Sequence, residues 1–473
     1  MPLILGTNSI KDTGYDVANS LRFNSGSSDD LVYTPSSTGN RRTFTWSVWV
    51  KRSKLGASQF TLFKKEGSGS DTNGNGNADY LGLAYFNSDD TLQVARNQEG
   101  DFVNVKTTRV FRDVSAWYHI IVSIDTTQGT GSNRVRCWIN GTEESLTFTV
   151  TPTQNREFDF NQSGEAHHLG SYGGGSYLDG YLTECVFLDG TAVTGATDFG
   201  EFDSDSPTIW KPKDVSGLSF GTNGFYLDFE NASSLGADVS GNGNNFTVNN
   251  LTSVDQSTDT CTNNFCTMNS LYPDGTITFS EGNLKLTQGS SWRSAGGTMA
   301  VSTGKWYWEV SNVGNYAYIG FADIQLFNEG CSIRESFTTG SATTGKAHSV
   351  LNSDGRHYQV TSGGAQTSEY PSAATFSTFT NSIIGIALNL DDNNFIFYKD
   401  GTAMNPSGTP ISITAGTYIP AVSIYGTNVS YNFGSPPYSI SSGNSDANGH
   451  GNFEYAVPSG YFALCTKNLA EYG

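Results

Sequence analysis

The sequence is poor in positive charge. It has 26 Lys and Arg residues against 45 Asp and Glu residues, which gives a net charge of −19. Binding to phosphate needs clustered Lys and Arg to displace counterions, so this balance argues against nucleic acid as a partner. It is compatible with neutral glycans and with cations as ligands.

Long apolar runs are also lacking. No stretch approaches the roughly 18 apolar residues of a membrane span, so we expect no membrane insertion. The run Met1-Pro-Leu-Ile-Leu-Gly6 has no basic region before it and is too short for a signal peptide. We therefore expect synthesis in a cytoplasm without active export.

Cysteine is sparse and scattered. The six cysteines lie at positions 137, 185, 261, 266, 331 and 465. Disulfide frameworks are small and dense in cysteine, so this spacing favours free and mostly buried thiols. A bond between Cys261 and Cys266 stays open as an alternative.

Glycine and aromatic residues are abundant instead. The chain has 54 Gly and 13% aromatic residues but only 15% charged residues, and helical periodicity never exceeds about two turns. Such a composition is typical of short strands joined by tight turns. The length of 473 residues allows roughly two to four domains, and we expect an all-β protein.

Three similar turn signals punctuate the sequence. Asn140-Gly141 and Asp400-Gly401 each follow an apolar alternating run, and Asp189-Gly190 ends a third run. A type I′ turn needs positive φ at both central residues, which Asn-Gly and Asp-Gly pairs supply. These pairs predict antiparallel β modules in both halves of the chain.

The best strand of the first half is the segment 42–51. Its alternation predicts one face made of Phe44, Trp46, Val48 and Val50 and another made of Thr45, Ser47 and Trp49. We interpret it as a strand with one buried face.

Four pieces in order give the first half a family resemblance. They are "FTWSVWVK" at 44–51, "WYHIIVSID" at 117–125, "RCWINGTE" at 136–143 and "GYLTECVFLDG" at 180–190. Residues 20–195 thereby resemble the LamG, or concanavalin A-like, sandwich. The resemblance implies a jelly-roll of two packed sheets that binds carbohydrate, often with calcium, and in some members hydrolyses it.

A second resemblance covers residues 276–473. The segments "GKWYWEV" at 304–310, "YIGFA" at 318–322, "GIALNLD" at 385–391 and "FYKDG" at 397–401 are similar to the signature of SPRY domains. This implies a second two-sheet sandwich, one that binds protein partners through its loops. The Asp-, Asn- and Gly-rich residues 196–275 are then a connector partly packed on the sandwiches, and residues 1–19 an N-terminal arm.

Catalysis is not expected. Hydrolases of the concanavalin A-like fold carry Glu-x-Asp-x-Glu on one strand, and the nearest match here is Glu157, Asp159 and Asn161. An asparagine cannot protonate a leaving group, so retaining hydrolysis by this strand is disfavoured. The alternative stays a concanavalin A-like glycoside hydrolase that depolymerises host envelope polysaccharide.

Calcium is the only candidate cofactor. Oxygen ligands alternate through Asp71, Asn73, Asn75, Asn77 and Asp79, with a glycine where a calcium loop bends. The position at which an EF-hand-type loop needs a bidentate Glu is Gly82. The alternative is an ordinary turn rich in Asn and Gly.

Exposed aromatic residues are the candidate glycan contacts. Tyr172 and Tyr177 flank a glycine-rich loop, and Tyr316 precedes a strand of the second module. Rings on loops can stack on sugar faces, whereas the alternative is local packing.

The neighbouring histidines His167 and His168 point to opposite faces of a strand, so we expect structural histidines there rather than a shared metal.

The whole chain resembles virion proteins of marine tailed phages. The order of the two modules, the connector, the opening "MPLILGTNSI" and the closing "PSGYFALCTKNLAEYG" carry this resemblance. It implies a non-catalytic tail fibre, spike or head decoration on the particle surface. The arm would join other virion proteins, and the modules would bind host-surface glycans.

The resemblance also implies an oligomeric state. The protein is expected to form a homo-oligomer, such as a trimer, because fibres are usually trimers. A purely structural spacer without any ligand is the remaining alternative.

Overall fold

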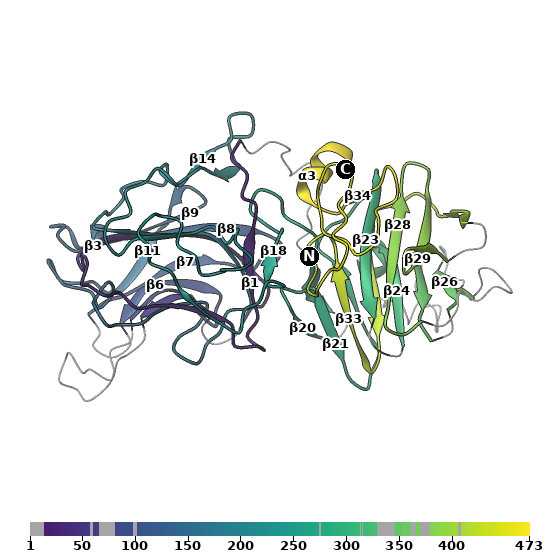
Figure 1. The fold of residues 1–473 in the computed structure, drawn as a ribbon, viewed down its shortest axis with the longest axis horizontal. Coiled ribbons are helices and arrows are strands. Elements are labelled where there is room, and N and C mark those ends of the chain that lie inside the picture. Colours follow the sequence, from purple (N-terminus) through teal and green to yellow (C-terminus); the bar gives the residue numbers. More distant parts are fainter. Residues whose placement is uncertain are drawn as a thin grey trace. The chain divides into compact units, whose positions relative to one another are not determined.

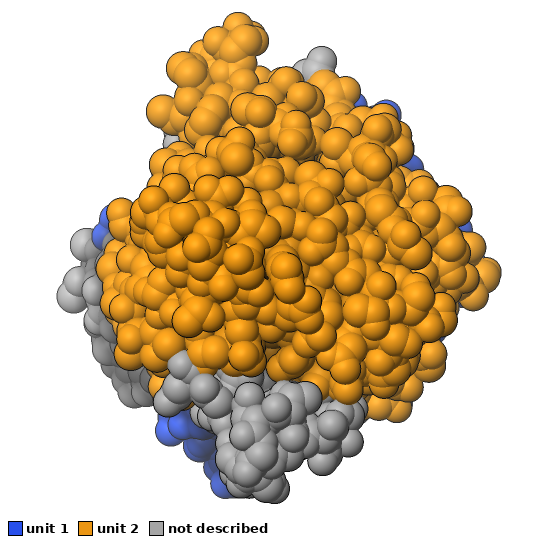
Figure 2. Space-filling view, turned by 90° about the vertical axis from the view of Figure 1, so that its left-hand side faces the viewer, with its two compact units in different colours: residues 1–12, 263–473 blue, residues 13–262 orange. Residues whose placement is uncertain are grey.

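The chain folds into two units, which Figure 1 shows as a ribbon of the computed structural model. Residues 13–262 form the N-terminal unit, orange in Figure 2, and residues 263–473 belong to the C-terminal unit. The structure describes residues 14–56, 60–65, 81–97, 102–273, 276–312, 314, 316–328, 346–353, 355–360, 366–368, 379–404 and 408–473. The expected all-β class with two tandem antiparallel sandwiches is confirmed.

The N-terminal unit has two main sheets. The first runs, in spatial order, through β10 (Thr142–Glu143), β9 (Val135–Ile139), β8 (Trp117–Asp125), β3 (Thr43–Arg52), β13 (Gly180–Asp189), β1 (Ser20–Phe23) and β18 (Gln256–Ser257), with β16 (Phe225–Leu227) beside β13. The second runs through β11 (Leu146–Val150), β7 (Asn104–Val110), β6 (Thr91–Asn97), β5 (Leu81–Phe86), β4 (Phe60–Lys65), β12 (His167–Leu169), β2 (Asp30–Tyr33) and β17 (Thr247–Asn249).

The core of this unit lies between the two sheets. Alternate residues of β3 supply its centre, and Phe44, Trp46, Val48 and Val50 are all fully buried. They pack against residues of β4 and β5 in the second sheet, and the indole of Trp46 stacks on Phe63 with ring centroids 5.5 Å apart. The predicted face of segment 42–51 is thus confirmed.

The other face of β3 is buried as well, which corrects the prediction of a single buried face. Trp49 is 4% exposed and belongs to a second apolar cluster outside the sandwich. That cluster forms because residues 190–226, including the small hairpin of β14 (Gly200–Phe202) and β15 (Trp210–Pro212), cover the outer surface of the first sheet. We call this segment the cover.

Trp210 anchors the cover. Its indole N–H donates to Nδ1 of His119 at 2.9 Å, and His119 Nε2 lies 2.8 Å from Ser47 Oγ. The imidazole also stacks on Trp49 at 4.7 Å. Gly141 and Gly200 make room for the indole, because a Cβ at either position would lie within 2.6 Å of its ring.

The C-terminal unit repeats the two-sheet plan. One sheet runs through β19 (Met268–Pro273), β22 (Arg293–Gly297), β32 (Tyr418–Ile424), β24 (Ala317–Asp323), β25 (Ala347–Leu351), β26 (His357–Val360) and β27 (Gln366–Ser368). The other runs through β20 (Thr278–Ser280), β21 (Lys285–Gln288), β33 (Thr427–Asn432), β23 (Lys305–Asn312), β28 (Ser382–Asn389), β29 (Asn394–Lys399) and β30 (Thr402–Ala403), with β31 (Ile411–Ser412) and β34 (Phe462–Ala463) beside β29 and β23.

Its core again lies between the sheets. Trp306 and Trp308 on β23 are fully buried, together with Ile384 and Ile386 on the neighbouring β28. The described part of the chain also contains two short α-helices, α1 (Ile324–Asn328) and α3 (Thr466–Tyr472), and a 3₁₀ turn, η2 (Gly131–Asn133).

Two of the three predicted turns are hairpins, and both have the same backbone conformation and the same hydrogen bonds to a neighbouring strand. Asn140 and Gly141 have φ of 47° and 78°, and Asp400 and Gly401 have φ of 47° and 76°. The backbone N–H of Asn140 donates to the carbonyl of His119, whose own N–H donates to Asn140 Oδ1 at 2.7 Å. Asp400 exchanges the same two bonds with Ile383, the second at 2.9 Å.

The third turn is not a hairpin. Gly190 has positive φ but Asp189 does not, and the next strand, β14, starts only at Gly200. The carboxylate of Asp189 instead accepts hydrogen bonds from the backbone of Asn40 and Asn223 and from the amide of Asn161.

The segment assigned to a connector, 196–275, adds strands to both main sheets of the N-terminal unit. β16 pairs with β13, β17 with β2, and β18 with β1. The buried salt bridge between Lys51 Nζ and Asp259 Oδ2, 2.7 Å long, fixes its end on the first sheet.

Cysteines 137, 185, 261, 266 and 465 form no disulfide bond, so Cys261 and Cys266 are not bonded to each other. Cys331, residues 1–13 of the predicted arm and the predicted calcium loop with Asp71, Asn73, Asn75, Asn77 and Asp79 lie outside the described residues. Among the helices that are described, none has the length and apolar character to cross a membrane.

Candidate functional site

Three aromatic residues share one end of the first sheet of the C-terminal unit. Arg293, Ile424 and Ala317 stand side by side on β22, β32 and β24. One position beyond them along each strand lie Trp292, Tyr425 and Tyr316. Because side chains alternate along a strand and Ala317 and Ile424 face the core, these three rings belong to the outer face.

The rings form a continuous group, which we call the aromatic platform. The ring of Trp292 lies near both tyrosines, with its centroid 5.6 Å from that of Tyr425 and 6.4 Å from that of Tyr316. Tyr316 and Tyr425 meet edge to face at 6.1 Å. Tyr316 is 47% exposed, and Trp292 and Tyr425 are half-buried.

Two hydrogen bonds to backbone carbonyls hold the platform in place. The N–H of Tyr425 donates to the carbonyl of Tyr316 at 3.0 Å, and Arg293 Nη1 donates to the carbonyl of Trp292 at 2.9 Å. Tyr316 itself has φ of 64°, a conformation that costs energy for a residue with a side chain. The protein thus keeps an exposed ring in a strained position.

Such a surface suits stacking. Aromatic faces bind the apolar faces of sugar rings and also serve as anchors in protein interfaces. Tyr316 was predicted as a glycan contact. Trp292 and Tyr425 were not, because only the strand register brings their separate segments beside Tyr316.

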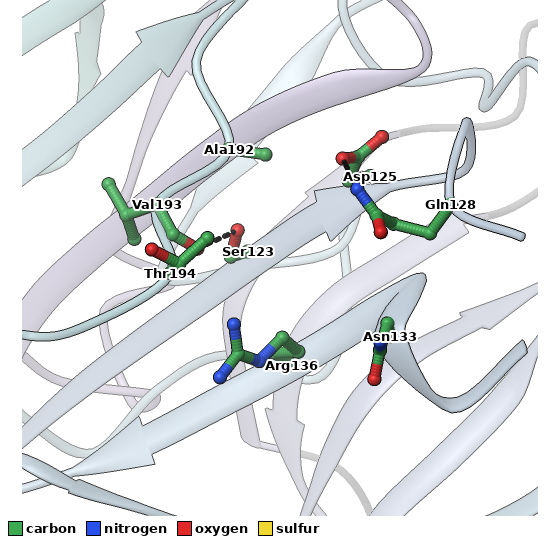
Figure 3. A pocket seen from close by; sticks show the side chains of 8 residues that line it. All are labelled: Ser123, Asp125, Gln128, Asn133, Arg136, Ala192, Val193 and Thr194. Atoms are coloured by element: carbon green, nitrogen blue, oxygen red, sulfur yellow. Dashed lines mark hydrogen bonds between the residues drawn. The ribbon is translucent and has the colours of Figure 1, made fainter. Parts of the chain in front are cut away.

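A polar pocket lies on the outer face of the N-terminal unit (Figure 3). It has a volume of about 180 Å³ and is lined by Ser123, Asp125, Gln128, Asn133, Arg136, Ala192, Val193 and Thr194. The sequence did not single out any of these residues.

In the predicted loop of Tyr172 and Tyr177, the ring of Tyr172 contacts a lysine of the same unit. The ammonium of Lys64 on β4 lies 3.6 Å from the ring centroid of Tyr172, a close cation–π contact. Burial, with Arg96 nearby, lowers the pKa of Lys64 to about 8. Both tyrosines are half-buried, and their role in glycan binding stays a prediction.

Residues 157–161 do not form a strand, so the expected strand with alternating carboxylates is wrong. Glu157 pairs with Arg41 and Arg42 at 3.2 and 2.8 Å, and Asp159 pairs with Arg41 at 3.0 Å. Asn161, with φ of 65°, is hydrogen-bonded to its neighbours. The three side chains therefore serve structural contacts in this geometry.

His119, His167 and His168 are buried structural residues. Burial lowers the pKa of His119 and of His167 to about 3. His167 Nε2 accepts the backbone N–H of Asn161, whereas His168 Nδ1 lies 3.0 Å from Asp30. Within the part of the chain that the structure describes, no three His, Cys, Asp or Glu side chains are grouped to hold a metal ion.

A buried carboxylate was missed by the sequence reasoning. Glu184 is 5% exposed and sits at a β-bulge of β13 with φ of 50°. Burial raises its pKa to about 8, although the hydroxyl of Tyr226 donates to it at 2.8 Å. Tyr15 adds a second, longer contact at 3.4 Å.

Comparison with known families matches both units. Residues 25–196 match the family described as "Concanavalin A-like lectin/glucanases superfamily", and residues 305–436 match the SPRY domain. No curated protein matches the chain.

Solved structures show similarity of fold at low identity. The SPRY domain of human HERC1 is 17% identical, with a TM-score of 0.26, and the match covers 35% of this chain and 96% of that one. A proposed carbohydrate binding protein from Bacteroides ovatus is 16% identical, with a TM-score of 0.34, over 50% of this chain and 59% of that one. A heptameric pentraxin from Limulus polyphemus is 17% identical, with a TM-score of 0.26, over 38% of this chain and 80% of that one.

The chain therefore carries a LamG, or concanavalin A-like, domain followed by a SPRY domain. Both are β-sandwiches of the kind used as binding modules.

Proposed function

We propose that this protein is a non-catalytic binding protein of a tailed-phage virion that binds glycans of the host surface. The observation that carries the proposal is the aromatic platform of Trp292, Tyr316 and Tyr425. Three rings held at the ends of three neighbouring strands offer stacking area at little cost in side-chain entropy, because each ring has only two rotatable bonds.

The net negative charge of the chain favours glycans over acidic partners as ligands. The net charge of −19 disfavours nucleic acid and anionic membranes but leaves neutral polyhydroxyl ligands unopposed. Stacking on sugar rings needs no charge. A non-catalytic role is supported by Glu157 and Asp159, whose carboxylates are paired with arginines.

The virion setting rests on the resemblance of the whole chain to virion proteins of marine tailed phages. We propose that the N-terminal arm joins other virion proteins, that the chain forms a homo-oligomer, and that both sandwiches are displayed on the particle surface.

Glycan binding is tested on an array of bacterial surface glycans with the full-length protein. We expect binding to at least one glycan class and a loss of tenfold or more in affinity for Trp292→Ala and for Tyr316→Ala. Phe202→Ala is the matched control, because Phe202 is a similarly exposed ring, 45% accessible, in the other unit. Failure of the wild-type protein to bind any glycan would overturn the proposal.

The virion setting has its own test. Gold-labelled antibody against this protein should decorate purified particles at the tail or the head in electron micrographs. Unlabelled particles, with the protein present only in the lysate of infected cells, would contradict the setting and leave the glycan result untouched.

A further inference from the structure

The polar pocket of the N-terminal unit is built from three rigid parts. Its floor is a cross-strand pair, Ser123 on β8 and Arg136 on β9, which face each other in register. One wall is the turn after β8, and the other is the segment 192–194 after β13 (Figure 3).

The floor is fixed by a salt bridge. Arg136 Nε and Nη2 donate to the two carboxylate oxygens of Glu143 at 2.7 and 2.8 Å. The guanidinium also lies over the ring of Trp138, 4.8 Å from its centroid. These contacts hold the cation in one orientation and neutralise its charge.

The turn wall is fixed by Arg134. Its guanidinium donates to the carbonyls of Gln128, Gly129 and Pro152 at 2.8, 2.9 and 2.7 Å. Within the turn, Asp125 accepts the side-chain amide of Gln128 at 2.6 Å. Burial alone would raise the pKa of Asp125, but hydrogen bonds from Thr127 and Gln128 outweigh it and lower that pKa.

The opposite wall is equally constrained. Ser123 Oγ donates to the carbonyl of Val193 at 2.9 Å, and the N–H of Val193 donates to Thr45 Oγ1 at 3.0 Å. Thr194 is exposed beside it. A pocket whose walls are held in this way loses little entropy when a ligand enters.

The lining selects the class of ligand. Asn133, Gln128 and Thr194 each offer both donors and acceptors, Asp125 accepts, and Ala192 and Val193 give a small apolar surface. The one cation is already neutralised by Glu143, which disfavours an anion, and a single carboxylate with an adjacent guanidinium disfavours a metal ion. Sugar hydroxyls both donate and accept, so a neutral sugar ring matches this lining.

Size limits the ligand to one ring. The volume of about 180 Å³ is well below the roughly 300–1,000 Å³ of pockets for drug-sized ligands. From these observations we infer that the pocket binds a single neutral sugar residue at the end of a glycan. The inference rests on the proposed glycan-binding function and adds a second subsite, on the other unit from the aromatic platform.

The test uses the full-length protein and a panel of methyl glycosides of neutral hexoses, with methyl glucuronide as the charged counterpart, in ligand-observed NMR. We expect weak binding of at least one neutral glycoside, with a Kd on the order of 1 mM, and no binding of the glucuronide. The variants are made in the Trp292→Ala background, in which the aromatic platform is disrupted. There Thr194→Trp should fill the pocket and abolish the signal, and Asn133→Ala should weaken it severalfold.

Thr147→Trp is the control for Thr194→Trp, because Thr147 is an exposed threonine on β11 in the other sheet of the same unit. A signal that survives Thr194→Trp in the Trp292→Ala background, or a wild-type protein that binds array glycans but no monosaccharide, overturns the inference while the proposed function stands. Absence of all glycan binding overturns both.

Discussion

Glu184 is a carboxylic acid kept neutral by its position. The bulge in β13 turns it inward with φ of 50°, and burial raises its pKa to about 8 from an ordinary value of 4.5. Between these two pH values the folded protein holds a proton that the unfolded chain releases. Folding stability therefore falls as the pH rises through this window, by up to about 1.4 kcal/mol per pH unit, and levels off above the folded pKa.

Replacing Glu184 by glutamine should remove this slope. The amide stays neutral at every pH and can still accept the hydrogen bond from Tyr226. Urea unfolding at pH 5.5, 7 and 8.5 should show Glu184→Gln gaining stability over the wild-type protein as the pH rises. Parallel pH profiles for the two proteins would contradict the assignment, and Glu157→Gln, at a surface carboxylate, should leave the slope unchanged.

At the same scale, the candidate site shows what a sequence can indicate about single residues. An exposed tyrosine before a strand, Tyr316, was visible as a candidate contact. Its partners Trp292 and Tyr425 come from segments far away in the chain, so their proximity depends on the pairing of β22, β32 and β24. The contact between Lys64 and Tyr172 was hidden for the same reason.

At the scale of elements, alternation and turn chemistry predicted the strands well. The segment 42–51 corresponds to β3 (Thr43–Arg52), and the hairpins at Asn140-Gly141 and Asp400-Gly401 formed as expected. The prediction of a third hairpin failed because residues from distant segments hydrogen-bond to the side chain at the expected turn. Asp189 binds Asn40 and Asn223 rather than closing a hairpin.

The cover leads to a prediction about stability. Trp210→Ala should destabilise the N-terminal unit by about 3–5 kcal/mol, because it leaves a cavity beside Trp49 and removes the donor to buried His119 Nδ1. Urea denaturation followed by circular dichroism measures this loss. Phe202→Ala, a neighbouring and exposed ring on β14, should cost far less; equal losses would show that Trp210 is no anchor.

At the scale of the whole molecule, each unit owns a core of its own. We expect residues 13–262 to fold when expressed alone. The shorter piece 20–195 lacks β16, β17 and β18, and without residues 196–226 it exposes Trp49 and Trp138. It should aggregate or unfold under the same conditions.

Size-exclusion chromatography and thermal melts of the two fragments give the comparison. A cooperative melt and a monodisperse peak are expected for residues 13–262 only. Equal behaviour of residues 20–195 would mean that the added strands and the cover are dispensable.

The two hairpin turns have a consequence for how the protein ages. Asn-Gly is the dipeptide most prone to deamidation, and Asp-Gly to isomerisation, because the glycine nitrogen can attack the side-chain carbonyl carbon and close a succinimide. In Asn140 and Asp400 the side-chain oxygen accepts the backbone N–H of His119 and Ile383 in the neighbouring strand, and this bond restricts the side-chain rotation that the attack requires. The hydrogen bond that joins the tip of each hairpin to the neighbouring strand should therefore also slow deamidation at Asn140 and isomerisation at Asp400.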